Sequence, residues 1–154
     1  MTSLVDAIYQ TEYNPFKYGE FLASFYLNLQ GVERNLLLSQ LVIPLCSHPV
    51  YKEKIERAVF KNNGGSTIWT IFSDKIPLYD LQERIDSFKQ LTDQSLQYCL
   101  INDWIIINSD SLAISVENPD EIKFVEQKSA KNLGKIFSNL SVIEVYALLG
   151  VTPR

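Results

Sequence analysis

Few residues in this sequence have the types and spacing that catalysis needs. His48 is the single histidine, and Cys46 stands two positions before it, beside a proline turn. At that spacing the two side chains cannot readily face each other, and no third group completes a nucleophile, base and orienting residue. Gly64-Gly65-Ser66 lacks the Gly-Lys-Ser/Thr ending that cradles the phosphates of a nucleotide. We therefore predict that the protein is not an enzyme and uses no cofactor.

The cysteines and carboxylates favour structural roles. Cys46 and Cys99 stand in apolar surroundings, so we expect two reduced, buried thiols, although the count also allows a disulfide. No metal site is expected, because there is one histidine and no Cys-x-x-Cys pair. Acidic pairs such as Glu83 with Asp86 are typical of solvated helix faces, since acid–base catalysis requires carboxylates held in a cleft.

Length and composition indicate one globular domain spanning residues 1–154. Hydrophobic residues make up 46% of the chain and sixteen residues are Phe or Tyr, which predicts an aromatic-rich core. The net charge is −4, whereas a dedicated nucleic-acid-binding protein usually has a basic balance. The first residues do not resemble a signal peptide, and the apolar runs are too short to span a membrane. We expect a cytoplasmic protein without membrane contact.

Hydrophobic periodicity and capping residues predict a mainly α (α+β) fold. Asn14-Pro15 should begin a helix whose apolar face includes Phe21. Ser141 and Gly150 should bound the last helix, which runs from Val142 to Leu149. Between these two, the sequence favours helices at 34–46, 50–60, 67–72, 80–100 and 127–137, a loop at 62–65, and a β-hairpin of 103–108 with 111–116.

The order of elements between about residues 50 and 116 is helix, short helix, long helix and hairpin, as in a winged helix. We expect a winged-helix-like unit there, flanked by N- and C-terminal helices. The long helix of such a unit often enters the major groove of DNA, but here residues 80–100 have a net charge of −2, which phosphates would repel. A protein-docking role is favoured, and a winged-helix transcription regulator that binds DNA is the alternative.

The basic residues are concentrated elsewhere. Residues 52–61 sum to +2 and residues 123–135 sum to +3. Lys128, Lys131 and Lys135 are the candidates for a weak DNA contact without sequence preference, because lysines bind phosphates mainly through charge. Solvated helix faces are the alternative interpretation of both segments.

The two helices nearest the chain ends are unusually apolar, which raises the question of what covers them. We predict that the first and last helices pack on each other and form part of a partner-docking surface. The candidate docking residues are Phe16, Phe21, Tyr146, Leu148 and Leu149. Simple core packing within the monomer is the competing interpretation.

Four short motifs resemble a known family when they are taken in order. They are Tyr13-Asn14-Pro15-Phe16 with Gly19, the run Leu41 to Leu45, the run Ala130 to Phe137, and the run Tyr146 to Pro153. Together they resemble the middle component of ABC-type three-component systems. These bacterial operons pair an ATPase similar to SMC proteins or Rad50 with a small middle protein and an effector, often a nuclease. The Lamassu anti-phage systems belong to this group.

The resemblance implies a function that the residues alone do not reveal. It implies a non-catalytic adaptor that links an SMC- or Rad50-like ATPase to an effector in an anti-phage defence complex. It also implies that the protein works as part of a hetero-oligomer and meets DNA only weakly or through its partners.

Overall fold

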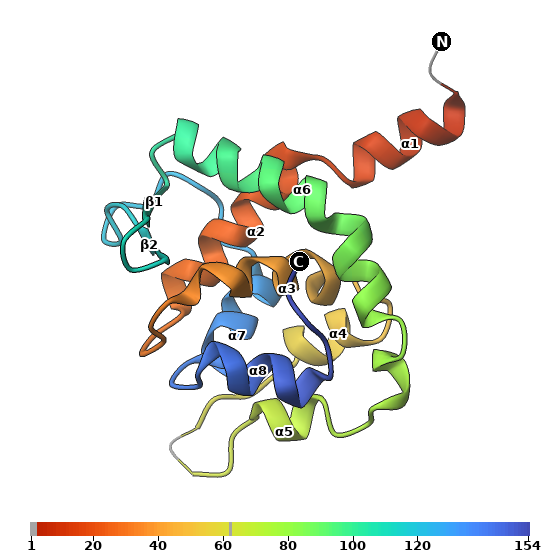
Figure 1. The fold of residues 1–154 in the computed structure, drawn as a ribbon, viewed down its shortest axis with the longest axis vertical. Helices are drawn as coiled ribbons and strands as arrows, with labels where there is room; N and C mark the ends of the chain where they lie inside the picture. The colour runs from red at the N-terminus through yellow and green to blue at the C-terminus, as the bar shows by residue number, and fades with distance from the viewer. Residues whose placement is uncertain (1–2, 62) are drawn as a thin grey trace.

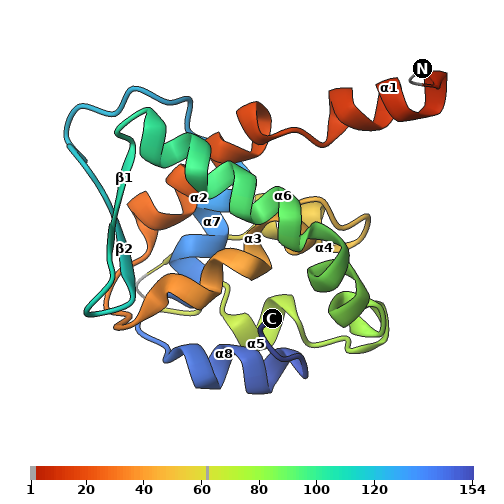
Figure 2. The ribbon, with the colours of Figure 1, turned by 45° about the horizontal axis from the view of Figure 1, so that its top comes forward.

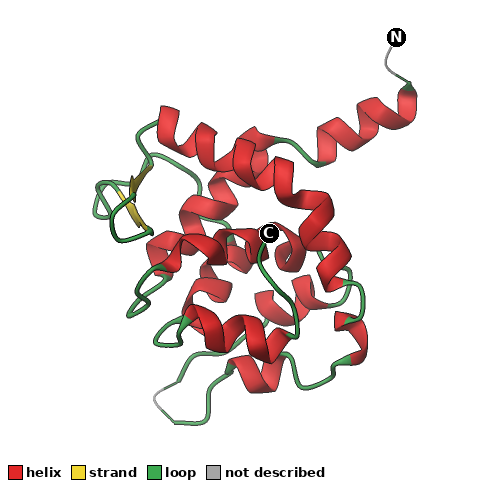
Figure 3. Ribbon diagram, in the orientation of Figure 1, coloured by secondary structure: helices red, strands yellow, loops and turns green. Residues whose placement is uncertain are grey.

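The computed structural model describes residues 3–61 and 63–154, so Asn62 of the predicted loop lies outside the described residues. Helices dominate, and one antiparallel hairpin is present among the described residues, which confirms the predicted mainly α fold (Figure 3). The elements in chain order are α1 (Leu4–Glu12), α2 (Pro15–Asn28), the 3-10 turn η1 (Asn35–Leu38), α3 (Ser39–Cys46), α4 (Tyr51–Glu56), α5 (Ile68–Ile71), the 3-10 turn η2 (Ile76–Leu78), α6 (Leu81–Ile101), β1 (Ile105–Asn108), β2 (Ala113–Val116), α7 (Lys128–Phe137) and α8 (Val142–Leu149).

Helix α2 lies at the centre of the core and packs against both α6 and α7 (Figure 1). Its approach to α7 is close because Gly134 faces the α2 backbone, where an added Cβ would lie 2.5 Å from the Phe25 carbonyl oxygen. Helix α3 fills the remaining side, and every one of its residues is buried. The aromatic-rich core expected from composition is present, with Phe25, Phe72 and Phe137 fully enclosed.

Local capping explains why the predicted start of α2 and both predicted ends of α8 match the observed ones, whereas the helix predicted at 50–60 ends at Glu56 and the one predicted at 34–46 is α-helical only from Ser39. The Asn14 side chain accepts a hydrogen bond from the Lys17 amide, and Pro15 occupies the first turn of α2. Ser141 forms a reciprocal capping box with Glu144 at the start of α8. Gly150 ends α8 in the left-handed region, at φ 72°, as its position after the last apolar residue predicts.

Residues 50–116 contain the predicted order of elements but share their core with the flanking helices. Helix α6 packs mainly on α2 and α3, which lie outside this segment. The hairpin pairs Ile105 with Val116 and Asn108 with Ala113. It is fastened to η1 by Asn35, whose side chain accepts a hydrogen bond from the Ile114 amide at 2.7 Å and donates one to the Ile114 carbonyl at 3.2 Å.

The first helix of the chain is α1, which the periodicity at Asn14 did not predict. Ser3 and Asp6 form a capping box that begins this helix. Helix α1 extends away from the body at one end of the molecule, in red in Figure 1 and again in the rotated view of Figure 2. All of its residues are described, and none of them is buried.

Candidate partner-docking surfaces

One face of α1 is apolar and uncovered. Leu4, Val5, Ile8 and Tyr9 are 77%, 74%, 61% and 52% exposed. Their spacing of i, i+1, i+4 and i+5 places them on one side of the helix. These four residues form the surface that we call the α1 face. The spacing was present in the sequence, and together with Ser3 it could have identified the helix.

Helix α1 meets the rest of the protein through aromatic stacking at its end. The Tyr9 and Tyr13 rings lie 4.9 Å apart, and Tyr13 lies 5.3 Å from Phe88 of α6. Lys17 also forms an ion pair with Glu12 at 3.0 Å, but both groups are exposed, so this pair adds little stability. Tyr9 of the α1 face takes part in this stacking, whereas Leu4, Val5 and Ile8 are the most exposed residues of that face.

The predicted docking residues near the chain ends divide into buried and accessible ones. Tyr146 and Leu149 are 5% and 3% exposed, and Phe21 is buried as well. Phe16 is 67% exposed and meets Tyr98 edge-on at 5.0 Å. Leu148 is half-buried. Core packing therefore accounts for Phe21, Tyr146 and Leu149, while Phe16 and Leu148 stay accessible.

The prediction that the helix after Asn14 and the last helix pack on each other needs correction, because η1 lies between these two helices, α2 and α8. The Tyr146 hydroxyl of α8 donates a hydrogen bond to the Leu37 carbonyl at 2.6 Å. The Tyr26 hydroxyl of α2 donates to the Asn35 carbonyl at 2.9 Å, on the same turn. Burial raises the pKa of both phenols, so they remain protonated donors. Two buried tyrosines thus hold η1 from opposite sides.

A second apolar surface lies between α5 and α8, at the opposite end of the molecule from α1 (Figure 1). It is a groove of about 640 Å³ lined by Ile68, Trp69, Leu140, Glu144, Ala147 and Leu148. Trp69 is 60% exposed there. We call this surface the α5–α8 groove. Leu148 is the one predicted docking residue that lines this groove.

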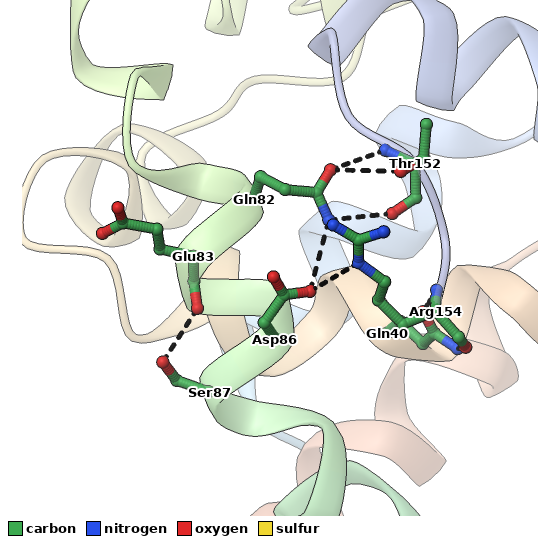
Figure 4. A network of polar contacts seen from close by, with 7 residues as sticks. All are labelled: Gln40, Gln82, Glu83, Asp86, Ser87, Thr152 and Arg154. Atoms are coloured by element: carbon green, nitrogen blue, oxygen red, sulfur yellow. Dashed lines mark hydrogen bonds and ion pairs between the residues drawn. The ribbon is translucent and has the colours of Figure 1, made fainter.

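The segment after α8 is held by two glutamines (Figure 4). The Gln82 side chain accepts a hydrogen bond from the Thr152 amide at 2.8 Å and donates one to the Thr152 carbonyl at 3.1 Å. Gln40 does the same for Arg154, at 2.8 Å and 2.6 Å. The Arg154 guanidinium also reaches Asp86 at 2.7 Å and holds the pKa of that carboxyl below its usual range. This arrangement, the tail clamp, joins residues 152–154 to α3 and α6.

The candidates for chemistry are held in structural roles. Burial raises the pKa of the Cys46 and Cys99 thiols to about 12, so neither is a thiolate nucleophile at neutral pH. His48 Nδ1 accepts hydrogen bonds from the amides of Val50 and Tyr51 at 3.0 Å and 3.3 Å. The proton must then sit on Nε2, which lies 3.1 Å from the Pro77 carbonyl oxygen and donates to it. His48 therefore acts as a cap for the start of α4.

Neither a metal centre nor a membrane span is found in the part of the chain that the structure describes. No three His, Cys, Asp or Glu side chains of residues 3–61 and 63–154 gather closely enough to hold a metal ion. None of the helices in these ranges combines the length and apolarity needed to cross a membrane.

The three candidate lysines lie on the outer side of α7. Lys128 and Lys135 are exposed, and Lys131 is half-buried with an ion pair to Glu126 at 3.2 Å. The Lys135 ammonium lies 5.2 Å above the centre of the Phe60 ring. Helix α7 buries its opposite side against α2, which fixes the direction in which the lysines point.

Comparison with known proteins identifies a family. The family described as ABC-three component (ABC-3C) system Middle Component 3 matches residues 2–153. No curated protein and no solved structure matches the chain.

Proposed function

Because this chain belongs to the Middle Component 3 family of ABC-three component systems, we propose that it is the adaptor subunit that links an SMC- or Rad50-like ATPase to an effector in an anti-phage defence complex. The family match covers nearly the whole chain and confirms the resemblance seen in its motifs. A middle component of a multi-component system has protein partners. The identities of the ATPase and the effector, and the defence role, are part of the proposal.

The observation that carries the proposal is the uncovered α1 face. An isolated helix of nine residues is marginal in water, so such a helix usually gains stability from a packed apolar face. Burying the exposed parts of four large apolar side chains is worth on the order of 4–8 kcal/mol before the costs of association are subtracted. A protein partner would supply the apolar surface that the described part of this chain does not.

The arrangement of the two apolar surfaces supports a bridging role. Helix α1, which carries the α1 face, lies at the opposite end of the molecule from α5 and α8, which border the α5–α8 groove (Figure 2). Two partners can therefore bind at the same time without competing for space. A rigid core between the surfaces would then set the spacing of the ATPase and the effector.

We propose that the protein contributes no chemistry of its own to the complex. The buried thiols and the capping role of His48 support this, because none of these groups is placed to act on a substrate. The purified chain should then show neither ATPase nor nuclease activity. Metal-dependent DNA cleavage that disappears in an Asp103→Asn variant would contradict this view.

Co-purification of the chain with its operon's ATPase and effector tests the adaptor role. The double variant Leu4→Asp/Ile8→Asp changes the α1 face and should release one partner while retaining the other. The control Ala7→Asp/Gln10→Asp adds the same charge on the opposite side of α1 and should retain both. Trp69→Asp in the α5–α8 groove should release the remaining partner.

Melting curves keep these outcomes interpretable. Since no α1 residue is buried, the double variant should unfold at the wild-type temperature. If it melts normally and still brings down both partners, α1 is not a docking element. If all variants retain both partners, the adaptor proposal in this form is wrong.

The regulator alternative has less support. The exposed side of α6 carries Glu83, Asp86 and Asp93, and its apolar side packs on α2 and α3. Phosphates would be repelled by that exposed side.

A further inference from the structure

The basic residues of this acidic protein are concentrated in two segments. Residues 52–61 and 123–135 contain eight of the fourteen Lys and Arg residues, but three of the eighteen Asp and Glu residues. Their combined charge is +5, while the other 131 residues have a net charge of −9. The two segments are far apart in the sequence, so only the fold can place them on one surface.

The fold does bring the two segments together, because α4 packs on α7. The buried Asn132 side chain of α7 donates hydrogen bonds to the Ile55 and Glu56 carbonyls at 2.9 Å and 3.2 Å, at the end of α4. Beyond that end, Phe60 lies under the Lys135 ammonium. The chain that follows α4 therefore runs beside the lysines of α7.

Five cations make up what we call the α4–α7 basic face: Arg57, Lys61, Lys128, Lys131 and Lys135. The three lysines of α7 lie within about 60° of one another around the helix and span about 10 Å along it. Arg57 and Lys61 are exposed, and in the sequence they flank Phe60, over which the Lys135 ammonium lies. The acidic groups in this region are Glu53, which pairs with Arg57, Glu126, which pairs with Lys131, and the half-buried Glu56.

Ion pairing leaves much of this positive charge free. Among the described residues, Lys61, Lys128 and Lys135 take part in no ion pair. The neighbouring apolar side chains are only partly exposed: Val59 is 49% and Phe60 is 39% exposed, and the Lys135 ammonium lies above the Phe60 ring. A protein interface usually needs an apolar or aromatic anchor at its centre, whereas a phosphate backbone needs only charge.

We propose that the α4–α7 basic face binds the phosphate backbone of duplex DNA without reading its sequence. A row of lysines about 10 Å long faces about six phosphate charges of a duplex. The negative charge of the remaining surface would orient the molecule so that this face alone meets the DNA. The face is separate from the α1 face and the α5–α8 groove, so its loss should leave co-purification with protein partners unchanged.

Fluorescence anisotropy of a labelled duplex of about 30 base pairs, titrated with the purified full chain at several salt concentrations, tests the proposal. We expect a dissociation constant of roughly 10⁻⁴–10⁻⁶ M and a log–log salt slope of about −3 to −4. The triple variant Lys128→Gln/Lys131→Gln/Lys135→Gln should bind at least about tenfold more weakly and reduce the slope by about 2 to 3. Adding Arg57→Gln/Lys61→Gln to this triple variant should reduce the salt slope further, because the two segments form one face.

A charge-matched control separates this face from the net charge. Lys17→Gln/Lys75→Gln/Lys89→Gln removes the same charge elsewhere, from the exposed Lys75 and the half-buried Lys17 and Lys89, and should weaken binding less than about threefold. Equal losses in the two triple variants, or wild-type binding by the α7 variant with a normal melting curve, would overturn the proposal. Tighter binding of labelled polyglutamate than of DNA at the same salt would also overturn it, in favour of an acidic protein segment.

Discussion

We expect Gly134→Ala to destabilise the protein, although alanine is the better helix former. The new Cβ would lie 2.5 Å from the Phe25 carbonyl oxygen and 3.2 Å from the Leu29 nitrogen. Both obstacles belong to the backbone of α2, so no side-chain rotation can relieve them. To restore ordinary contact at about 3.5 Å, α7 would have to move away from α2 by about 1 Å.

The size of the effect follows from what that movement would disrupt. A gap of about 1 Å forfeits a quarter to a half of the dispersion energy across an interface. The Ser138 hydroxyl also joins the end of α7 to the segment after α2. It donates a hydrogen bond to the Gly134 carbonyl at 2.7 Å and accepts one from the Gln30 amide at 3.0 Å. Overpacking of this kind costs about 3 kcal/mol, and the gain in helix propensity returns about 1 kcal/mol. The net loss of about 2 kcal/mol corresponds to a Tm lower by about 4–8 °C.

Thermal and urea denaturation followed by circular dichroism measure this loss, and Gly19→Ala is the matched control. Gly19 is also buried in a helix, but its Cβ would meet a side-chain atom, Cδ1 of Tyr98, at 2.8 Å. The half-buried Tyr98 ring can turn aside, so this variant should stay within about 1 kcal/mol of wild type. If Gly134→Ala is as stable as wild type, or less damaging than Gly19→Ala, the close approach of α7 to α2 is not as described.

Three further outcomes are expected. Burial and the nearby Arg84 charge lower the pKa of His48, so as pH falls the unfolded chain takes up a proton, near pH 6.5, before the folded chain does. The free energy of unfolding should therefore fall as pH drops from about 7 to 5, and urea titrations of His48→Asn should show a weaker dependence on pH. Tyr146→Asp should lower the free energy of unfolding by several kcal/mol and unfold the protein, whereas Leu148→Asp should change that free energy by no more than about 1 kcal/mol. Equal melting temperatures for the two variants would contradict the burial of Tyr146. Gln82→Ala should lower stability by about 1–2 kcal/mol in urea denaturation and expose the segment around Thr152 to hydrogen exchange, and unchanged protection there would rule out the tail clamp.

The elements that could be predicted from the sequence are those with local causes. Asn14, Ser141 and Gly150 act within one helical turn of themselves, so the boundaries they imply are correct. The long acidic helix and the hairpin also follow from short-range patterns. Helix α1 was not predicted, although Ser3 and the helical spacing of Leu4, Val5, Ile8 and Tyr9 are local signals of the same kind.

Contacts between distant residues could not be predicted in the same way. Tyr146 was equally compatible with a core and with a docking surface until its hydroxyl was found on Leu37, across 109 positions. The two basic segments meet because α4 packs on α7, where Asn132 donates a hydrogen bond to the end of α4. Similarly, the order of elements in residues 50–116 follows from local sequence patterns, but those patterns do not reveal that α6 packs on α2 and α3.

The tail clamp bears on how the protein resists unfolding with time. Its hydrogen bonds join residues that are 70 and 114 positions apart, so forming them closes long loops at an entropic cost. We expect such contacts to form after the folding transition state and to act mainly on the unfolding rate. The glutamines should therefore set how long a folded molecule survives between openings, while the folding rate depends on the α2, α6 and α7 core.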